Sequence, residues 1–498
     1  MKKFLKQIGI LLMTEIILGC QSKPNSDSKE GQKANKENKV TLAFNQDPVG
    51  NLNPHEYLPS QFITQDMVYD GLVSYGENGE IKPMLAESWT ISEDGKTYTF
   101  KLRPNVKFSD GSAFDAKNVV KNFDTIFSKE NKSKHSWFAF TNHLKSYRAV
   151  DDLTFEIVLD TPYTATLYDL AMIRPIRFLG DAGFPEGGDT MKGIKAPIGT
   201  GAWVLKEHKN NEYAVFVRNE YYWGEKPAAS EIIIKNIPDS ETLALQFESG
   251  DIDLIYGNGL ISLDRFNSYR QDNGKYTTAT SNPMSTRMLL MNTTSSILGD
   301  LNVRKALNHA VDKESIAKNI FDGIREKNGK KMVLSFPYIS SKVTDKSIGE
   351  YIQGEWEKIG IQVELKAMEE KAYWQNATAK NYDIMSDFSW GAPWDPHAFL
   401  TAMADNSASN TNPDYAAQLG LPMKAQLDKT IKALLVEPNE QKLNEMYTYV
   451  LTTLHEQAVY IPISYQAMLS VYRTGELEGV KFMPEENRIP AWSVKKVK

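Results

Sequence analysis

A single cysteine, Cys20, stands at the end of a short apolar run near the N-terminus. A chain of 498 residues with one cysteine cannot form an internal disulfide, a CxxC redox pair or a cysteine-based zinc cluster. Its fold must therefore rest on buried apolar surface. With 41% apolar and 24% charged residues, the composition allows a large core.

The residues around Cys20 have the pattern of a bacterial lipoprotein signal. Three lysines lie within the first six residues, and the apolar run Ile8–Leu18 is too short to span a bilayer. Gly19 then precedes Cys20. We expect residues 1–20 to be the signal, with cleavage before Cys20 and acylation of its thiol, so that the lipid holds the chain on a membrane. An ordinary signal peptide with a coincidental cysteine is the alternative.

The segment 21–39 contains no aromatic and no β-branched side chain. It cannot bury enough apolar surface to order itself, so we expect a flexible tether. Anchor and tether together place a folded body, beginning near residue 40, outside the cytoplasm on the cell surface.

The body has the pattern of a mixed α/β protein without internal repeats. Val40, Leu42 and Phe44 alternate with polar residues, which predicts a strand. Further strands are expected at 96–103, 154–159, 213–218, 232–237 and 361–365, and helices near 115–123, 303–311, 312–323 and 348–359. The first half is richer in strands and the second alternates helices with strands, so we expect two lobes of different character.

Motifs for catalysis, metal ligation and nucleic-acid binding are missing. The seven histidines form no HxxxH, HxH or HExxH pattern, and neither a P-loop nor GxSxG occurs. The net charge of -6, without a basic stripe, argues against nucleic acid as a partner. The sequence therefore predicts a binding protein rather than an enzyme.

Three local settings stand out. Arg174 lies among apolar residues next to Pro175, and a buried arginine needs an anionic partner, which a protein carboxylate or a ligand could supply. Trp390 and Trp394 are spaced by Gly-Ala-Pro in a predicted loop, although two core indoles would also fit. The segment 134–137 reads as a solvated helix end.

One long motif indicates a family. It runs Trp89-x-x-Ser92-x-Asp94-Gly95-x-x-Tyr98-x-Phe100-x-Leu102-Arg103 and continues into Val106-x-Phe108-x-Asp110-Gly111. It resembles the signature of the extracellular solute-binding proteins of dipeptide, oligopeptide and nickel ABC importers. Supporting matches are Ile198–Gly201, Arg218-Asn219-x-x-Tyr222-Trp223, Gly250-x-Ile252-Asp253 and Val303–Asp312.

The resemblance covers residues 40–498 and implies a two-lobed α/β fold of the periplasmic-binding-protein type, with a hinge. It places an enlarged, strand-rich first lobe at 40–281 with a C-terminal return at 463–498, and a second lobe at 282–462. It also implies a monomeric, non-enzymatic substrate-binding component that works with an importer's permease and ATPase at the outer face of the bacterial cell membrane.

Within the family, the local sequence most resembles the nickel-binding branch. The matching stretches are Asn53-Pro54-His55, Lys195–Gly201, Tyr256-Gly257-Asn258 and Trp390–Phe399. Oligopeptide-binding relatives place an aspartate shortly after this tryptophan, where it pairs with the peptide's α-amino group, and here the stretch reads Gly-Ala-Pro. Loss of that anionic anchor disfavours peptides. A dipeptide- or oligopeptide-binding component is the alternative.

Resemblance to this branch implies that the ligand is nickel already held by a small polycarboxylate or by L-histidine, with no cofactor and no direct protein ligand on the metal. Arg174 corresponds to the family's cleft arginine, whose forked guanidinium suits a carboxylate. The expected chelate-binding residues are Tyr57, Phe62, Lys134, Trp137, Arg174, Trp390, Trp394 and Asn487.

The chain departs from the family pattern at three places. Lys134 stands where some members have a second arginine, which would replace a bidentate contact by a point charge. The stretch 405–415 lacks the histidine with which some members ligate the metal. After Gly323 a few dozen family residues, including a helix, are missing, so the second lobe is expected to be shortened.

Overall fold

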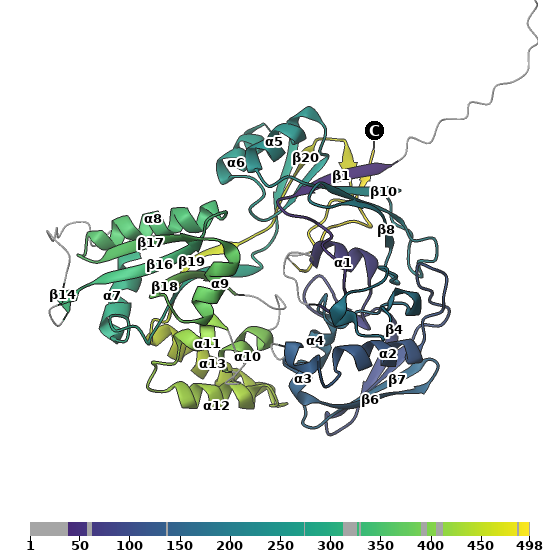
Figure 1. Ribbon diagram of the computed structural model, residues 1–498, viewed down its shortest axis with the longest axis horizontal. Coiled ribbons are helices and arrows are strands. Elements are labelled where there is room, and N and C mark those ends of the chain that lie inside the picture. The colour runs from purple at the N-terminus through teal and green to yellow at the C-terminus, as the bar shows by residue number, and fades with distance from the viewer. Residues whose placement is uncertain are drawn as a thin grey trace, which may run out of the picture. The chain divides into compact units, whose positions relative to one another are not determined.

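The computed structural model describes residues 38–56, 62–135, 138–272, 274–311, 326–327, 330–389, 396–404, 412–485 and 488–497 (Figure 1). The chain divides into two units, 1–37 and 38–498, and every structural statement below concerns the second. In the described ranges, no helix is both long and apolar enough to cross a membrane.

A seven-stranded sheet is built around the strand predicted at Val40. In spatial order it contains β12 (Tyr276–Thr280), β20 (Leu469–Arg473), β11 (Leu254–Gly257), β1 (Lys39–Phe44), β10 (Glu231–Asn236), β9 (Tyr213–Arg218) and β8 (Trp203–Lys209). β1 pairs in parallel with β10 over its whole length and with β11 at Leu42. Burial of Val40 and Leu42, two residues apart, follows from the alternation of side chains along a strand.

The C-terminal part of the chain returns into this sheet, because β20 pairs antiparallel with both β11 and β12. Just before it, β19 (Tyr460–Gln466) pairs with β13 (Ser285–Met291) in a different sheet. The two connecting segments therefore run side by side. Ser281 N donates to the carbonyl of Met468 at 3.0 Å, and Met284 N donates to the carbonyl of Gln466 at 2.9 Å. Two adjacent connecting segments therefore join the seven-stranded sheet to the sheet that contains β13 and β19.

A four-stranded antiparallel sheet follows β1 in the sequence. Its order is β4 (Ala86–Ile91), β5 (Thr97–Leu102), β7 (Thr154–Leu159) and β6 (Leu144–Asp151). The predicted Asp94-Gly95 turn joins β4 to β5, with Gly95 at φ +68°. Helix α2 (Ala116–Ile126) packs on β6, and it begins as predicted at Asp115, whose carboxylate accepts from Asn118 N at 2.9 Å. The buried face of α2 includes Val119 and Phe123.

The second half alternates helices and strands, as the sequence predicted. A three-stranded sheet has the order β18 (Ile384–Phe388), β13 and β19. β16 (Val333–Ile339) lies beside β18 and pairs in parallel with β17 (Gln362–Met368) through the helix α8 (Val343–Glu357). The predicted helix near 303–311 is α7 (Leu301–Val311). The expected helix at 312–323 lies outside the described residues.

The remaining elements connect and cover these sheets. The helices are α1 (Phe62–Val68), α3 (Phe140–His143), α4 (Thr166–Ala171), α5 (Ser240–Ser249), α6 (Leu263–Gln271), α9 (Glu370–Thr378), α10 (His397–Ala404), α11 (Pro413–Ala417), α12 (Lys424–Leu434) and α13 (Glu440–Glu456), with short 3-10 turns η2 (Lys132–His135), η3 (Asp181–Gly183) and η4 (Thr190–Lys192). The short strand pairs are β2 (Val73–Tyr75) with β3 (Ile81–Pro83), β14 (Glu326–Lys327) with β15 (Lys330–Lys331), and β21 (Leu477–Glu478) with β22 (Lys495–Lys496). Among the described residues, three apolar clusters form the core, and one of them lies on the seven-stranded sheet.

Candidate ligand-binding site

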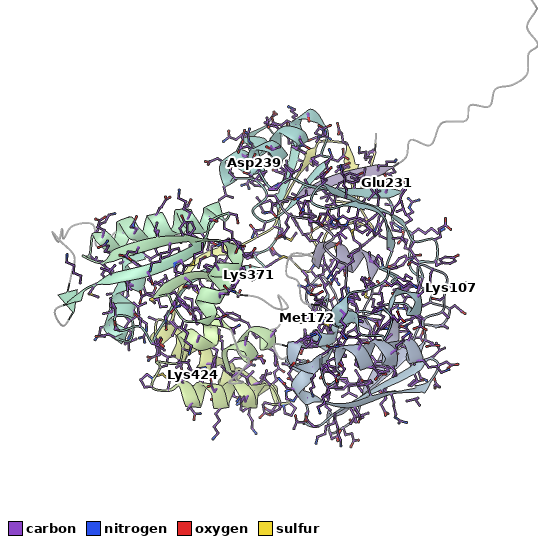
Figure 2. All side chains as sticks on the ribbon, viewed as in Figure 1. Lys107, Met172, Glu231, Asp239, Lys371 and Lys424 are labelled. Atoms are coloured by element: carbon purple, nitrogen blue, oxygen red, sulfur yellow. The ribbon has the colours of Figure 1, made fainter. Side chains whose placement is uncertain are left out.

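Arg174, the predicted cation of the site, is almost fully buried, with 1% of its surface exposed. It lies in the loop after α4, two residues beyond Met172, which is labelled in Figure 2. Its Nη1 donates to the main-chain carbonyl of Glu56 at 3.4 Å. The loop after α4 therefore contacts the N-terminal segment at the residue that precedes Tyr57 in the sequence.

The Asn53-Pro54-His55 motif holds this N-terminal segment in place. His55 Nε2 donates to the carbonyl of Arg177 at 3.0 Å, and its Nδ1 lies 2.8 Å from the hydroxyl of Thr190. Burial lowers the pKa of His55 to about 4, so the ring is neutral at pH 7 and its Nδ1 can accept the Thr190 hydroxyl proton. Asn53 Nδ2 donates to the carbonyl of Thr190 at 2.6 Å. The motif thus fixes residues 53–56 against Arg177, three residues from Arg174.

A cluster of buried charges links three distant segments around Arg177. Arg488 forms ion pairs of 2.8 Å with Asp66 and with Glu485. Arg177 donates to two main-chain carbonyls, and burial lowers its pKa to about 10. Asp66 belongs to α1, whereas Glu485 and Arg488 flank the predicted position Asn487. The ion pairs therefore join α1 to the C-terminal segment that contains Asn487.

Sequence reasoning did not identify this cluster. Ion pairs between distant positions leave no local pattern, so Asp66, Glu485 and Arg488 gave no signal. Only Arg177 could have been noticed, because it shares with Arg174 the apolar surroundings that predicted a buried cation.

Two of the family motifs meet at Asp70, next to α1. Trp223 Nε1 donates to its carboxylate at 2.8 Å and the hydroxyl of Thr200 donates at 3.1 Å. Burial raises the pKa of Asp70 to about 6. At Gly199 a Cβ atom would stand 2.0 Å from the carbonyl oxygen of Val68, so the close approach of this motif to α1 requires glycine.

Lys134 is exposed, and its Nζ lies 3.3 Å from the side-chain oxygen of Asn131. Its neighbour His135 is buried, and burial lowers the pKa of that imidazole to about 4. For the other residues predicted to bind the ligand, the structure describes no side-chain positions. Tyr57, Trp137, Trp390, Trp394, Asn487 and Cys20 lie outside the described residues, and of Phe62 only its place as the first residue of α1 is described.

Both ends of the predicted tryptophan loop are anchored. Ser389 N donates to the carbonyl of Thr286 at 2.9 Å, and Thr286 N donates to the Ser389 hydroxyl at 2.9 Å, which fixes the first end to β13. At the other end His397 begins α10. Its ring lies 3.2 Å from the hydroxyl of Tyr447 and 3.4 Å from that of Thr164.

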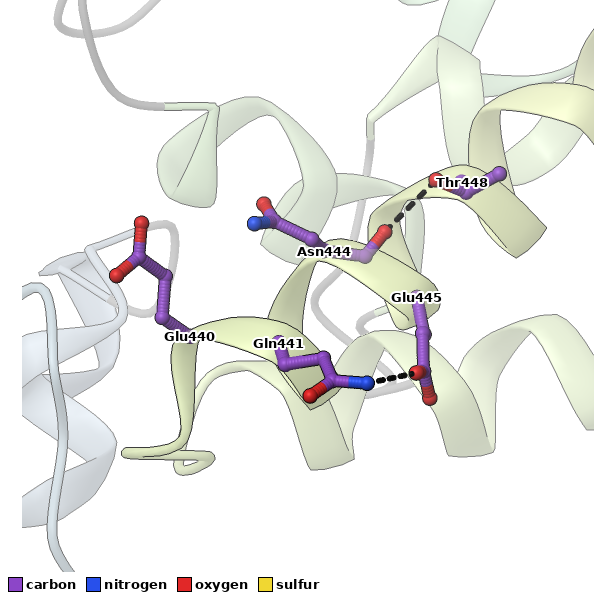
Figure 3. A pocket seen from close by; sticks show the side chains of 5 residues that line it. All are labelled: Glu440, Gln441, Asn444, Glu445 and Thr448. Atoms are coloured by element: carbon purple, nitrogen blue, oxygen red, sulfur yellow. Dashed lines mark hydrogen bonds between the residues drawn. The ribbon is translucent and has the colours of Figure 1, made fainter.

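Two surface hollows lack the buried arginine that was predicted for the ligand site. One, of about 600 Å³, lies along α13 (Figure 3), and its lining residues are Glu440, Gln441, Asn444, Glu445 and Thr448. The hydrogen bonds there are ordinary helical contacts, from Gln441 to Glu445 and from Thr448 to the carbonyl of Asn444. The second, of about 490 Å³, lies beside the two crossings and is lined by Ser281 and Phe482, among others. Arg174 lines neither hollow. In the part of the chain that the structure describes, no three histidine, cysteine or acidic side chains are placed to hold a metal ion.

Comparison with known proteins agrees with the fold. The profile of the bacterial extracellular solute-binding proteins, family 5, matches residues 80–338 and 322–411. The two matches meet at 322–338, next to the place where family residues were expected to be missing. The nickel-binding periplasmic protein of Escherichia coli (strain K12) is 39% identical, over 90% of this chain and 93% of that protein.

Solved structures are also similar. NikA from Brucella suis, in complex with Fe(III)-EDTA, has a TM-score of 0.86 and 37% identity, over 92% of this chain and 99% of that one. NikZ from Campylobacter jejuni, in complex with Ni(L-His), has a TM-score of 0.75 and 24% identity over the same shares, which supports the fold alone. The chain therefore has the two-lobed α/β fold of periplasmic binding proteins, and it belongs to family 5 of the bacterial extracellular solute-binding proteins, the substrate-binding components of ABC importers.

Proposed function

We propose that this protein captures nickel as a small-molecule chelate at the outer face of the cell membrane and delivers it to the permease of an ABC importer. Two relatives above 35% identity support the choice of ligand, since one is named a nickel-binding protein and the other holds a metal chelated by EDTA. The printed descriptions of both relatives name a bound ligand and no catalysed reaction, which supports a binding protein rather than an enzyme. The ATPase of the importer would supply the energy for transport.

The buried guanidinium of Arg174 is the structural observation that carries this proposal. A chelate of nickel with a polycarboxylate or with L-histidine presents carboxylate oxygens at its surface. A buried arginine binds a carboxylate through charge-assisted hydrogen bonds, which are stronger away from bulk water. In this proposal Lys134, Trp137, Trp390 and Trp394 add a second charge and aromatic walls, and Tyr57, Phe62 and Asn487 complete the site.

Chelation by a small molecule also accounts for selectivity. At an open protein site the Irving–Williams order favours copper over nickel. A closed chelate moves the discrimination to the shape and charge of the complex, which Arg174 and flat aromatic side chains can recognise. No protein side chain then needs to bond to the metal.

Calorimetry with dialysed protein tests the proposed ligand. Four titrations are compared, with nickel alone, nickel with excess L-histidine, nickel with EDTA, and a dipeptide. Weak binding of nickel alone and tight binding of a chelate is the expected result. Tight one-to-one binding of nickel alone, lost on replacement of one of the seven histidines, would contradict the chelate model. Tight binding of the dipeptide alone would instead favour the peptide-binding alternative.

The membrane anchor and the lobes are further parts of the proposal. Cys20 would carry the lipid, and the segment 21–39 would keep the body clear of the bilayer. The lobes, proposed at 40–281 with 463–498 and at 282–462, would move about the paired crossings near Ser281 and Met468. The residues expected to be missing after Gly323 would belong to the second lobe, at 282–462.

A further inference from the structure

A polar contact joins the first half of the chain to the second at Thr164, in the loop before α4. The main-chain N–H and the hydroxyl of Thr164 both donate to the carbonyl oxygen of Leu435, each at 3.2 Å. The hydroxyl oxygen also lies 3.4 Å from Nε2 of His397. Thr164 and Leu435 are 271 positions apart in the sequence. These polar contacts therefore tie the lobe proposed at 40–281 to the lobe proposed at 282–462.

On the side of the second half, helices hold the groups that Thr164 meets. His397 is the first residue of α10 and is 7% exposed, and its Nδ1 lies 3.2 Å from the hydroxyl of Tyr447 on α13. Leu435 directly follows α12. With the ring proton on Nε2, His397 accepts from Tyr447 and donates to Thr164. The Thr164 hydroxyl then keeps its own proton for the carbonyl of Leu435, so each donor in this chain has an acceptor.

On the side of the first half, Tyr163 gives Thr164 a rigid base. Tyr163 is fully buried, and its ring stacks on that of His143 with the centroids 4.6 Å apart and the planes 8° from parallel. Its hydroxyl donates to Asp169 Oδ2 at 3.0 Å. The same ring meets His397 edge-on, with the centroids 6.4 Å apart. The residue next to Thr164 is thus fixed within its own half and also contacts the other half.

Apolar residues next to these polar groups belong to a cluster that both halves share. The cluster includes Tyr163 and Ala165 from the first half, and Leu434 and Leu435 from the second. Thr164 itself is exposed. Water can therefore reach its hydroxyl, and a hydrogen bond lost there is replaced by one to water at small cost. The hydroxyl can part from the second half without being left unpaired.

The contact lies away from the two crossings that connect the lobes near Ser281 and Met468. β20 directly follows the second crossing, and Figure 1 shows α10 and α12 well apart from β20. A rotation of one lobe about the crossings moves points near the axis least and distant points most. The contact at Thr164 must therefore separate when such a rotation widens the space between the lobes.

We propose that Thr164 is a latch residue, whose contacts with Leu435 and His397 hold the lobes closed and must part before a ligand can enter or leave. This inference rests on the lobes and on the ligand of the proposed function. A contact that stabilises the closed form over the open form raises the apparent affinity for any ligand enclosed between the lobes. Thr164 therefore affects binding as a positioning residue, without contact to the ligand itself.

Three variants test the latch. Thr164→Val removes the hydroxyl but keeps the shape of the side chain, whereas Thr164→Ser keeps the hydroxyl. Thr161→Val is the matched control, because Thr161 is also exposed and its hydroxyl contacts are with the first half, namely Nδ1 of His143 at 2.8 Å and Asp160 at 3.0 Å. Urea unfolding should give Thr164→Val and Thr161→Val equal stabilities, since a latch stabilises the closed form rather than the fold of each lobe.

Two further measurements compare the variants. Small-angle X-ray scattering of the ligand-free protein should give a larger radius of gyration for Thr164→Val than for the wild type. Stopped-flow release of nickel–EDTA, or of nickel with L-histidine, should be about two- to tenfold faster from Thr164→Val, the factor expected for the loss of one hydrogen bond. Thr164→Ser and Thr161→Val should match the wild type in both measurements.

Unchanged scattering together with unchanged release in Thr164→Val would overturn the latch. So would a loss of stability in urea larger than that of Thr161→Val with an unchanged rate of release, since the contact would then belong to the folded structure alone. If the wild type binds neither chelate, the proposed function is refuted. The scattering comparison then decides the latch by itself, and an unchanged radius of gyration in Thr164→Val would exclude it.

Discussion

Arg488 and Asp66, near opposite ends of the sequence, form a buried ion pair with an N–O distance of 2.8 Å and side-chain exposures of only 4% and 7%. The pair joins the C-terminal segment to α1, and Glu485 completes it from the other side of Arg488. Buried ion pairs add little net stability compared with apolar residues, but removal of one partner leaves an uncompensated charge. A substitution in this cluster should therefore destabilise the packing between α1, which begins at Phe62, and the C-terminal segment that contains Asn487.

Replacement of Arg488 by leucine should lower the free energy of unfolding by about 3–5 kcal/mol, because Asp66 and Glu485 remain buried without their cation. Urea unfolding measures the loss. Arg148→Leu is the control, since Arg148 pairs with Glu156 at the surface with 64% of its side chain exposed. That change should cost about 1 kcal/mol or less. Equal effects of the two variants would show that burial of the Arg488 pair is energetically unimportant.

Replacement of Arg174 by alanine should weaken binding of the chelate at least tenfold, which corresponds to ~1.4 kcal/mol. Arg174→Lys should recover part of the affinity, since a point charge cannot make the bidentate contact. Calorimetry gives the affinities, and parallel urea curves check that the variants fold. Arg148→Ala should bind normally. Unchanged affinity of a folded Arg174→Ala protein would assign Arg174 to structure alone.

Gly199→Ala should destabilise the protein by about 1–3 kcal/mol or more, because the new Cβ would stand 2.0 Å from the Val68 carbonyl oxygen. Gly354, within α8, has open space around it. Gly354→Ala should therefore stabilise the protein by about 1 kcal/mol through helix propensity. Thermal unfolding of both variants measures these changes in stability. An unchanged stability of Gly199→Ala would mean that the backbone at the contact with α1 shifts to make room for the methyl group.

Acid should destabilise the protein through His55. Its pKa is 6.5 in the unfolded chain and about 4 in the fold, so below pH 6.5 the unfolded chain binds a proton that the folded protein does not. Stability is therefore lost as the pH falls from 6.5 to about 4, by up to about 3 kcal/mol. His55→Gln should remove about one proton from the pH dependence of urea unfolding.

Cys20→Ser should release the protein from the membrane into the medium with chelate binding intact, because the serine cannot be acylated at this position. Fractionation of cells that express each form, followed by calorimetry on the released protein, measures both properties. A serine variant that stays membrane-bound and is cleaved as before would exclude Cys20 as the anchor.

The strands and helices were predictable where one face is buried. The alternation at Val40 gave β1 and the aspartate cap at Asp115 gave the start of α2, because both patterns depend on neighbours within a few residues. The pairing of β20 with β11 and β12 could not be derived in this way. Which strands meet depends on packing across the whole chain, so only the resemblance to a family indicated a C-terminal return.

For the candidate site, the sequence predicted a buried cation at Arg174, and the contact of this residue with a ligand stays a prediction. Arg174 attracted notice because a cation among apolar residues is rare, and the structure buries it. The ion pairs of Arg488 with Asp66 and Glu485 gave no sign in the sequence, because a pairing between distant positions leaves no local pattern.

The return of β20 also sets an order of events during export. The strand lies between β11 and β12, so the seven-stranded sheet stays incomplete until residues 469–473 have crossed the membrane. Until then the edges of β11 and β12 expose unpaired N–H and C=O groups, which can pair with other chains. A nascent chain halted before residue 469 should therefore need protection by a chaperone or degradation by a protease, and translocation rather than local helix formation would limit how fast the mature protein accumulates.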